Sequence, residues 1–415
     1  MTTLSVIIPA FNEEDGIDKV IKRVLGIRDA LAKINVALEF IVVDDGSRDN
    51  TAARIAEYPD VRLVRHLKNR GYGAAIKTGF RHANGEYLAF LDADATYPPE
   101  YLPDMCRVAI EQNGDMIIAS RMSGAKSQMP LTRRVGNLAY AMLLSLISNT
   151  RVRDTSSGMR VIRRESLERM YPLPDGLQFT PAMSTRAIHE NLKVIELPVP
   201  YSERVGRSKL SVVRDGVRFT NAIVWTALSY NPVRILGLIS MAMLALSGLV
   251  GLYILGLRVM GVTALNVWQS YAVFAAGVTA VIGISLFSLG AMFNYLVALF
   301  HKKPVRQGLF GKPMFNPPLE NHFGWVGLVA IAIGAVLGIG SLVLSLQGTP
   351  AERLWFYLLA ATVVTIIGVQ LLISWIVMRV LDELAQRADA AQHDLVESEP
   401  ASVVELQRPA PVQAN

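Results

Sequence analysis

The sequence of 415 residues predicts an α/β domain with a doubly wound, mostly parallel sheet, followed by an α-helical membrane domain of four transmembrane helices. Two observations carry this prediction. Short runs rich in Val, Ile, Leu and Phe alternate with amphipathic stretches as far as about residue 220. From about residue 233 to 381 there are long uncharged stretches, and charged residues make up only 18% of the chain, against about 25% in a typical soluble domain. These features exclude an entirely soluble protein.

Five apolar runs in the first half have the composition of strands buried on both faces, as in a parallel sheet. They are residues 5–8, 40–43, 61–64, 87–91 and 116–119. Amphipathic stretches lie between them and predict helices at 16–33, 74–82 and 100–112. This alternation is typical of a doubly wound α/β domain, in which ligands bind beyond the carboxyl ends of the strands.

Chemically active side chains follow three of these strands directly. Asp92-Ala93-Asp94 offers two carboxylates in a turn, and hard oxygen ligands of this kind suit Mg²⁺ or Mn²⁺. Asp44-Asp45-Gly46-Ser47 could bind a nucleoside, and Pro9–Glu14 follows the first strand. Each of the three also has a plainer interpretation as a turn or a helix start. Gly71-Tyr72-Gly73 opens a helix and could approach a phosphate, although a single Gly-x-Gly is weak evidence.

The second half contains four uncharged apolar segments, each longer than the roughly 20 residues that cross a bilayer. They lie near 235–257, 270–299, 323–346 and 354–378, within a membrane domain predicted at 233–381. The loop between the second and third segments is rich in Lys and Arg, which places this loop and both termini in the cytoplasm. The N-terminus offers no signal peptide, and the single Cys106 allows no intramolecular disulfide. The expected location is the cell (inner) membrane, with multiple passes.

Two further segments complete the predicted organisation, after a cytoplasmic catalytic domain at 1–205. Basic and aromatic residues alternate through 206–232, which favours an amphipathic helix in the membrane interface over a plain connecting helix. Residues 382–415 are rich in Ala, Gln, Glu and Pro, and are predicted to be a disordered tail. Membrane lipids are thus expected partners, a nucleic acid is not, and self-association is left open.

Several motifs, taken in order, resemble glycosyltransferase family 2. These are Val6–Glu13, Val42–Ser47 and Asp92-Ala93-Asp94, together with Asn69–Ala75, Asp154–Arg160 and Arg204–Leu210. More narrowly, residues 4–232 are similar to the dolichyl-phosphate mannose synthases and the bacterial polyisoprenyl-phosphate glycosyltransferases. The resemblance implies a GT-A-like, Rossmann-like fold. It also implies an inverting enzyme that moves a sugar from a nucleotide sugar, GDP-mannose or a UDP-sugar, to a polyisoprenyl (dolichyl or undecaprenyl) phosphate.

The resemblance also implies a role for individual residues. The nucleoside would be bound by Pro9, Phe11, Glu13, Val42 and Asp44. Asp92 and Asp94 would hold Mg²⁺ or Mn²⁺ and Ala93 would add backbone contacts, whereas Thr96 replaces a larger polar residue and leaves a third ligand open. The donor diphosphate would be bound by Arg204 and Lys209, and the acceptor phosphate by Arg121, Arg133 and Arg134. Of these, Asp94, Arg121, Arg204 and Lys209 would act in catalysis.

A lipid phosphate acceptor needs no general base, because its second pKa is about 6 and it is mostly deprotonated at pH 7. It needs a cationic site beside the membrane, and the apolar helix predicted at 138–147 could graze the bilayer or form plain core. Two other functions remain as alternatives. A processive polysaccharide synthase would need a base, for which Asp154 is the candidate, but its Gln-x-x-Arg-Trp string does not occur. A transporter or flippase would be expected to carry charges within its spans, and these spans have none.

Overall fold

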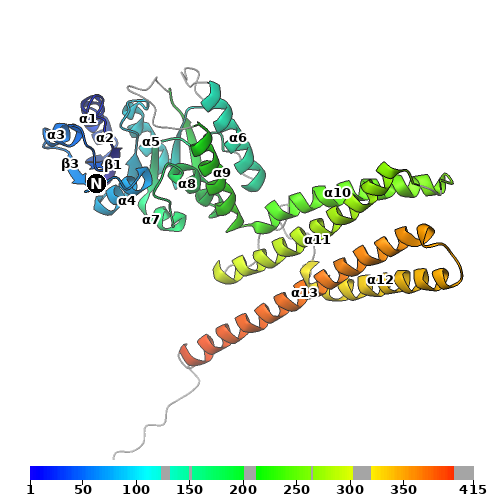
Figure 1. The fold of residues 1–415 in the computed structure, drawn as a ribbon. Coiled ribbons are helices and arrows are strands. Elements are labelled where there is room, and N and C mark those ends of the chain that lie inside the picture. Colours follow the sequence, from blue (N-terminus) through cyan, green and yellow to red (C-terminus); the bar gives the residue numbers. More distant parts are fainter. Residues whose placement is uncertain (123–130, 149–151, 201–211, 263–264, 302–318, 397–415) are drawn as a thin grey trace, which may run out of the picture. The chain divides into compact units, whose positions relative to one another are not determined.

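The structure is a computed structural model that describes residues 1–122, 131–148, 152–200, 212–262, 265–301 and 319–396. The chain divides into two compact units, Met1–Asn231 and Pro232–Asn415. The first unit contains a sheet with helices on both faces, and the second contains four long helices (Figure 1).

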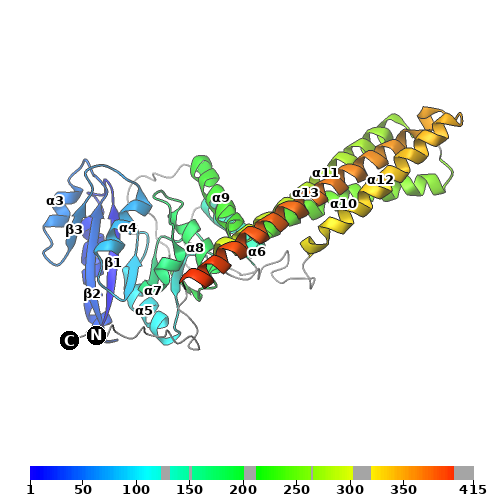
Figure 2. The same ribbon diagram turned by 90° about the horizontal axis from the view of Figure 1, so that it is seen from below.

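The first unit is built on a seven-stranded sheet with the strand order β3-β2-β1-β4-β6-β5-β7. The strands are β1 (Thr2–Ala10), β2 (Val36–Asp44), β3 (Arg62–Arg65), β4 (Tyr87–Phe90), β5 (Met116–Ser120), β6 (Arg160–Arg163) and β7 (Val194–Pro198). β6 runs antiparallel to both β4 and β5, and the other neighbouring pairs are parallel. The predicted doubly wound, mostly parallel sheet is therefore confirmed, and β1 and β2 lie side by side in Figure 2.

All five predicted strands are present, but one prediction about them is wrong. β3 is not buried on both faces, because it lies at the edge of the sheet and exposes Arg62 and Arg65. β6 and β7 were not predicted. Both are short and carry charged residues, among them Arg160 and Glu196, so neither shows the apolar run by which the other strands were recognised.

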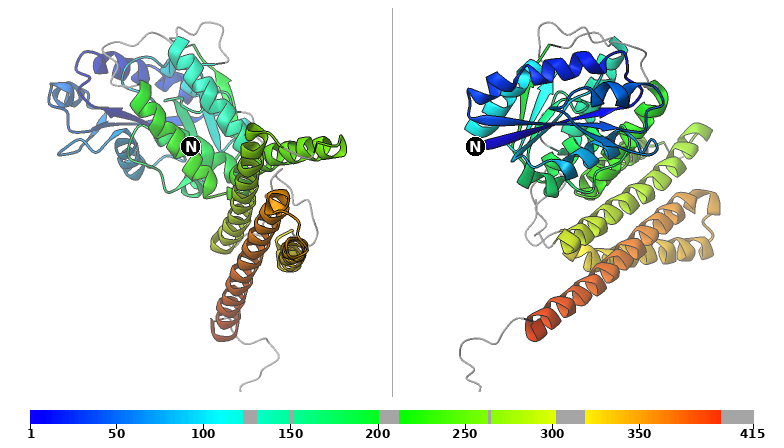
Figure 3. Two further views of the ribbon diagram at one scale, coloured as in Figure 1. Left: turned by 45° about the vertical axis from the view of Figure 1, so that its right-hand side comes forward. Right: turned by 90° about the vertical axis from the view of Figure 1, so that its left-hand side faces the viewer.

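Helices cover both faces of this sheet. One face packs against α1 (Ile17–Leu25), α2 (Arg28–Ala32) and α5 (Leu102–Glu111), whose apolar side chains share a core with Leu4, Val6 and Ile8 of β1. The helix predicted at 16–33 is thus two helices, α1 and α2. On the other face lie α4 (Tyr72–His82) and α8 (Phe179–His189), where Phe80, Phe90 and Phe179 form a cluster of aromatic rings. Figure 3 (right) shows the twist of the sheet between these layers.

The remaining elements of the first unit are short, apart from two longer helices. The short ones are α3 (Thr51–Ala56), η1 (Pro99–Tyr101), α7 (Arg164–Leu167) and η2 (Glu168–Met170). The longer α6 (Leu131–Ser148) and α9 (Val212–Leu228) pack together, since the Tyr140 hydroxyl donates to the Gly216 carbonyl at 3.1 Å and the Tyr140 ring lies 5.9 Å from that of Phe219. α9 covers the described part of the predicted interfacial segment.

The second unit contains α10 (Pro232–Val259), α11 (Val267–His301), η3 (Leu319–His322), α12 (Phe323–Leu346) and α13 (Ala351–Val396). Four of these helices are long and apolar enough to cross a membrane: Pro232–Leu257, Val267–Val297, Phe323–Leu346 and Leu354–Leu384. They coincide with the four predicted spans, and they fit a membrane protein. α13 continues to Val396, so the first part of the predicted disordered tail is helical. Residues 381–396 are mostly Leu, Ala, Glu, Gln and Arg, which favour helix.

Small and polar residues join the helices of the second unit. A Cβ atom on Gly327 of α12 would lie 2.7 Å from the Gly368 carbonyl oxygen of α13, so the two backbones meet where neither residue has a side chain. α11 is linked to α13 by two hydrogen bonds, from the Ser285 hydroxyl to Gln370 at 3.0 Å and from the Tyr295 hydroxyl to Asp382 at 2.8 Å.

Candidate active site

The topology of the sheet brings four loops to one edge. β1, β2, β4 and β5 point in the same direction, so the loops that follow them start at the same edge. β6 points in the opposite direction, so the loop that precedes it also reaches this edge. Asp44, Asp92, Arg121 and Asp154 belong to these loops or to the strand ends next to them.

Asp44, the last residue of β2, is completely buried at this edge. One carboxylate oxygen, Oδ1, accepts a hydrogen bond from the Ser47 backbone N–H at 3.0 Å. The other, Oδ2, lies 3.0 Å from Arg65 Nε but has no hydrogen-bond partner within the described part of the chain. A buried carboxylate oxygen without a hydrogen bond is costly, so Oδ2 is suited to accept an N–H or O–H of a ligand.

The loops after β1 and β2 are tied to each other by hydrogen bonds. The backbone N–H of Asn12 donates to Ser47 Oγ and that of Glu13 to Thr51 Oγ1, both at 2.9 Å. Asn12 has a φ of 50°, which turns the chain sharply after β1. Phe11 and Glu13 are half-buried, whereas Pro9 and Val42 are buried and Val42 packs in the hydrophobic core. The nucleoside-binding residues expected from the sequence therefore lie on two joined loops and the strands that lead into them.

Asp45, next to Asp44, has a different environment and holds the start of α4. Its carboxylate accepts hydrogen bonds from the backbone N–H groups of Arg70 and Gly71, at 2.9 and 2.8 Å, and lies 2.7 Å from Nδ1 of His66. The amide of Ala74, in the first turn of the helix, donates to the Asp175 carbonyl. The amide of Gly71 is thus taken up by Asp45, and an approach of Gly71-Tyr72-Gly73 to a phosphate stays a prediction. A Cβ atom on Gly71 would lie 2.6 Å from the Asp175 oxygen, so this glycine permits close packing.

Asp92 and Asp94 lie in a sharp turn after β4. The Tyr72 hydroxyl donates to Asp92 Oδ1 at 2.7 Å, and burial, followed by the charge of Asp92, raises the pKa of Tyr72 well above its usual value. Ala95 has a φ of 59°, a conformation that costs a non-glycine residue of order 1 kcal/mol and is found at constrained functional sites. Thr96 donates from its hydroxyl to Asp94 Oδ1 at 2.6 Å and from its backbone N–H at 3.2 Å. Thr96 thus supports Asp94.

The chemistry of this turn fits a divalent cation. Asp92 and Asp94 supply hard oxygen donors, and Gly158 leaves space beside Asp92, since a Cβ atom there would lie 2.6 Å from the carboxylate carbon. Within the described ranges, no cluster of three or more His, Cys, Asp or Glu side chains gathers to form a closed metal cage. Mg²⁺ in proteins is commonly bound by one or two carboxylates and completed by substrate phosphates. Two carboxylates are what this turn provides.

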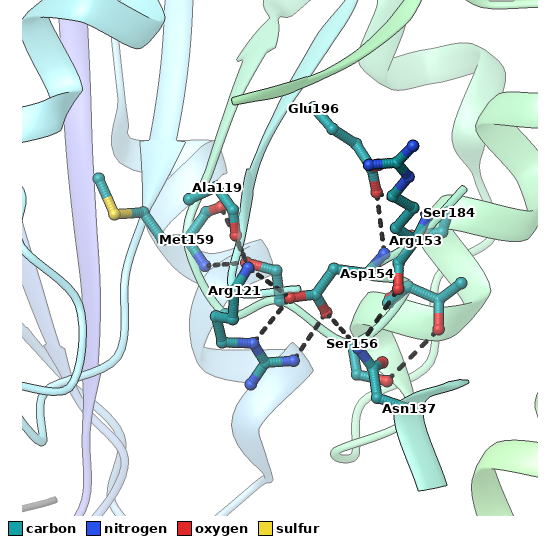
Figure 4. Close-up of polar contacts among 12 residues, drawn as sticks. Ala119, Arg121, Asn137, Arg153, Asp154, Ser156, Met159, Ser184 and Glu196 are labelled. Carbon is teal, nitrogen blue, oxygen red and sulfur yellow. Dashed lines mark hydrogen bonds and ion pairs between the residues drawn. The ribbon is translucent and has the colours of Figure 1, made fainter. Parts of the chain in front are cut away.

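Arg121, directly after β5, forms a buried ion pair with Asp154 (Figure 4). The Arg121 Nε and an Nη atom donate to the two carboxylate oxygens at 2.8 and 2.7 Å, and the Arg121 backbone N–H donates at 2.9 Å. Asp154 is completely buried and Arg121 is 13% exposed at its side chain. Although burial alone would raise the pKa of Asp154, the charge and hydrogen bonds of Arg121 hold it below its usual range.

The loop 154–159 connects this ion pair to the Asp92 turn. Its backbone is held from beneath by Arg160, a fully buried side chain that donates to the carbonyls of Ser157 at 3.2 Å and Thr155 at 2.8 Å. Burial lowers the pKa of Arg160 to about 10, so it is still charged at neutral pH. The Gly158 backbone N–H donates to the buried hydroxyl of Tyr97 at 2.7 Å. One fixed loop therefore contacts both the acid turn and the arginine.

Comparison with known proteins places the chain in a family. The family described as Glycosyl transferase family 2 matches residues 5–171, and a Domain of unknown function (DUF8752) matches residues 232–392. An undecaprenyl-phosphate 4-deoxy-4-formamido-L-arabinose transferase from Pectobacterium atrosepticum is 31% identical over 308 residues, covering 72% of this chain and 89% of that protein. The chain belongs to glycosyltransferase family 2.

Two relatives from Haloferax volcanii match about half of this glycosyltransferase. A dolichyl-phosphate hexose transferase from Haloferax volcanii is 30% identical over 221 residues, covering 53% of this chain and 92% of that protein. The low-salt glycan biosynthesis hexosyltransferase Agl6 from the same organism is 33% identical over 231 residues, and the chain spans only 54% of its length. The family resemblance found in the sequence, the GT-A-like fold and the assignment as an enzyme are thereby confirmed.

Solved structures resemble this glycosyltransferase only distantly. One of the similar structures is a crystal structure of glucosyl-3-phosphoglycerate synthase from Mycobacterium tuberculosis in complex with Mn²⁺, uridine diphosphate and glucosyl-3-phosphoglycerate. It is 21% identical, with a TM-score of 0.44, and the match covers 55% of this chain and 80% of that one.

The four other predicted phosphate-binding residues are less well placed by the structure. Arg204 and Lys209 lie outside the described residues, as does the side chain of Arg133. Arg134 lies near the start of α6 and is exposed. Their roles in this family 2 enzyme stay predictions.

The ion pair also bears on the alternative of a processive synthase, in which Asp154 would be the general base. A general base works best when its pKa lies near the operating pH. Arg121 moves the pKa of Asp154 in the opposite direction and occupies both of its oxygens. In this glycosyltransferase, Asp154 is therefore suited to hold Arg121 and unsuited to accept a proton.

Sequence reasoning missed several residues that shape the site. Tyr72, Gly158 and Arg160 stand inside motifs that were recognised, but no sequence signal shows which side chains they contact. Asn137 of α6 donates to Asp154 at 3.1 Å, and Glu196 of β7 accepts from the backbone N–H groups of Arg153 and Asp154 at 2.9 and 2.8 Å. Glu196 lies in a strand that was not predicted, so its approach to Asp154 could not be foreseen.

Proposed function

We propose that this glycosyltransferase moves a sugar from a nucleotide sugar to the phosphate of a polyisoprenyl phosphate and releases a lipid-linked sugar. The observation that carries the proposal is the Arg121–Asp154 pair, which supplies a cationic group beside the acid turn and leaves Asp154 unsuited to act as a base. The names of the relatives from Pectobacterium atrosepticum and Haloferax volcanii, with their undecaprenyl-phosphate and dolichyl-phosphate substrates, support the same acceptor class.

The donor would occupy the loops after β1, β2 and β4. Asp44 Oδ2, which is buried and lacks a hydrogen bond within the described residues, would accept a donor group of the nucleoside. Pro9, Phe11, Glu13 and Val42 belong to the strands and loops around it. These residues fit a guanosine or a uridine diphosphate sugar, and the sugar itself is left to experiment.

The diphosphate would lie at the Asp92–Asp94 turn, with Ala93 contributing backbone contacts. Asp92 and Asp94 would hold Mg²⁺ or Mn²⁺, which supplies positive charge for the departing diphosphate when bound. Arg204 and Lys209 would bind the same diphosphate. Tyr72 and Thr96 orient the two carboxylates through hydrogen bonds, so that the turn is set before the donor arrives.

The acceptor phosphate would be bound by Arg121, together with Arg133 and Arg134. Its charge lies between about −1.5 and −2 at neutral pH, so the nucleophilic oxygen needs no base. Attack on the anomeric carbon from the side opposite the departing diphosphate would invert its configuration. Asp154 holds the guanidinium of Arg121 in one orientation by bidentate hydrogen bonds, which limits the reorganisation needed on binding.

The pair of helices α6 and α9 would bring this acceptor site to the membrane. Large apolar side chains are exposed on both helices, with exposed fractions between 46% and 69%: Val135, Leu138, Met142, Val217 and Trp225. Arg134, Arg214 and Arg218 are exposed on the same helices. Apolar groups flanked by arginines are typical of helices that lie in the interface of an anionic membrane. We therefore infer that α6 and α9 contact membrane lipids.

The four apolar helices would anchor the enzyme with the catalytic unit and both termini in the cytoplasm. An even number of spans and the basic loop between α11 and α12 support this orientation. A cysteine introduced at Lys303, in a variant without Cys106, is expected to resist a membrane-impermeant thiol reagent in intact cells. Labelling of this cysteine from outside the cell would show that the proposed orientation in the membrane is wrong.

The function is tested with a panel of sugar nucleotides and an undecaprenyl or dolichyl phosphate, followed by mass spectrometry of the lipid. One donor is expected to give a lipid whose mass has increased by one sugar residue. Nuclear magnetic resonance of the product then gives its anomeric configuration, which is expected to be opposite to that of the donor. A chain of several sugars on a hydroxyl acceptor would favour a processive synthase instead. Transport of the lipid without any sugar nucleotide would favour a flippase.

A further inference from the structure

Asp154 is held at three points that come from three different elements of the fold (Figure 4). Arg121, after β5, binds both carboxylate oxygens, and Asn137 of α6 donates its Nδ2 to Oδ1 at 3.1 Å. Glu196 of β7 contacts the backbone, where its Oε1 accepts the N–H groups of Arg153 and Asp154. The carboxylate and the backbone of Asp154 are thus fixed separately.

The contact with Glu196 is unusual because it places a second carboxylate close to a buried one. Glu196 is half-buried and lies opposite Ile118 in the pairing of β5 with β7, two residues before the end of β5. Its repulsion with Asp154 disfavours this arrangement, whereas the two N–H groups favour it. The feature that holds the backbone in spite of this repulsion is an oxygen that reaches both N–H groups, and its reach does not depend on the charge of Glu196.

Asn137 of α6 makes the second contact that holds Asp154, a hydrogen bond to its carboxylate. Asn137 is 5% exposed, and it lies with the buried Ala141 and Leu144 on the side of α6 away from the exposed Leu138 and Met142. Its Nδ2 also lies 3.5 Å from the Arg153 carbonyl. Asn137 of α6 and Glu196 of β7 therefore contact the same two residues, Arg153 and Asp154.

We propose that Glu196 and Asn137 are positioning residues that fix Asp154, and through it the guanidinium of Arg121, for binding of the acceptor phosphate. The inference rests on the proposed function and assigns two residues to it. Neither touches the substrate. Each acts through Asp154, because loss of either contact leaves Asp154 free to shift and lets the Arg121 fork turn with it.

Two substitutions of Glu196 separate reach from charge. Glu196→Gln keeps an oxygen that can accept both N–H groups but removes the charge, whereas Glu196→Asp keeps the charge but is one methylene too short. We expect Glu196→Gln to behave like the wild type. We expect Glu196→Asp and Asn137→Leu to raise the KM for the polyisoprenyl phosphate by on the order of tenfold, with the KM for the sugar nucleotide unchanged. A role in stability alone would not raise one KM selectively.

Binding without donor provides a second measurement. Titration calorimetry in detergent, with farnesyl phosphate as the probe and farnesol as the control, is expected to show weaker binding of farnesyl phosphate by Glu196→Asp and Asn137→Leu. Glu165→Gln, which removes a surface ion pair with Arg163, is the matched control. It is expected to bind like the wild type.

The outcomes distinguish this inference from the proposed function. If the wild type binds farnesyl phosphate no better than farnesol, the proposed acceptor is wrong. If the wild type binds it and both Glu196→Asp and Asn137→Leu bind it equally well, the positioning role is wrong. If Glu196→Gln is impaired as much as Glu196→Asp, the charge of Glu196 matters rather than its reach, and the inference is again overturned.

Discussion

The Asp92–Asp94 turn, proposed for the donor half of the site, and the Arg121–Asp154 pair, proposed for the acceptor half, both contain carboxylates but hold them differently. In the donor half, the hydrogen bonds to Asp92 from Tyr72 and to Asp94 from Thr96 come from neutral hydroxyl groups. In the acceptor half, Asp154 is completely buried and receives the charged fork of Arg121. A carboxylate held by neutral donors keeps a negative charge that can attract a cation. The negative charge of a carboxylate paired with arginine is balanced within the protein. Both halves are therefore held by hydrogen bonds within the protein, but the acid turn is held by neutral donors and the acceptor half by a pair of opposite charges.

The largest effect is expected from loss of a donor-half carboxylate. If Asp94 holds the metal as proposed, Asp94→Ala should lower kcat by on the order of a thousandfold, because the charge stabilisation that the metal would provide is lost. The melting temperature should change little. Initial rates and thermal unfolding in detergent measure the two effects. Asp104→Ala, which removes a surface pair with Arg107, is the control and should leave both unchanged. Full activity in excess EDTA would contradict the proposal that Asp92 and Asp94 bind a catalytic metal ion.

Substitutions in the acceptor half should lower the stability of the fold as well as the affinity for the acceptor. Asp154→Asn leaves the Arg121 charge buried without its partner, so we expect a loss of about 3 kcal/mol in the free energy of unfolding. Asp18→Asn breaks an exposed pair with Arg54 and should cost less than about 1 kcal/mol. Since the pKa of Asp154 is lowered in the folded state, the wild-type advantage should be complete above its usual value of about 3.9 and disappear as the pH falls through the lowered value. Equal costs for the two variants would show that the buried Arg121–Asp154 pair matters no more for stability than an exposed pair.

Gly158→Ala tests whether the loop contacts the donor half as closely as the structure indicates. The new Cβ atom would press on the Asp92 carboxylate, so the Mn²⁺ concentration for half-maximal activity should rise by about tenfold. Electron paramagnetic resonance of bound Mn²⁺ provides a readout that is independent of turnover. Gly136→Ala is the matched control, because nothing lies within 4 Å of its Cβ position and alanine favours the helix. An unchanged Mn²⁺ affinity in Gly158→Ala would place the metal elsewhere.

The smallest effect is expected at the arginines near the start of α6. Arg133→Lys and Arg134→Lys should each raise the KM for polyisoprenyl phosphate by a few-fold, on the order of 1 kcal/mol or less, since lysine cannot reproduce a bidentate contact. The sugar-nucleotide KM should stay constant. If both variants keep the wild-type KM for the lipid, these arginines only attract anionic lipid, which is worth about 1 kcal/mol per residue and is indifferent to geometry.

The sequence was sufficient for the parts of the fold that depend on continuous apolar patterns. Four of the five predicted strands, all but the edge strand β3, and the four apolar helices have side chains that would be costly to expose to water, and this cost determines where they lie. β6 and β7 escaped prediction because their stability comes from pairing with β4 and β5 rather than from composition. The acids at the strand ends were identified from position alone.

The partners of the site residues could not be predicted in the same way. Tyr72 is 20 residues from Asp92, Asn137 is 17 from Asp154, and Glu196 is 42 from Asp154. A hydrogen bond between residues so far apart leaves no periodic trace in a single sequence. For the same reason the sequence could not show that Asp45 takes up the amides of Arg70 and Gly71 at the start of α4.

The reversed direction of β6 has a consequence for how this enzyme could change over evolutionary time. The donor loops follow β1, β2 and β4, all before residue 100, and hydrogen bonds lock the first two of them together. Arg121, which is assigned to the acceptor, follows β5, and Asp154, which holds it, precedes β6. The reversed direction of β6 brings Asp154 to the same edge without any change in the order of the donor strands. Insertions or replacements between β5 and β6 can therefore alter which acceptor is used while the donor loops keep their shape. The single antiparallel strand would thus allow the specificity for the acceptor to change separately from the specificity for the donor.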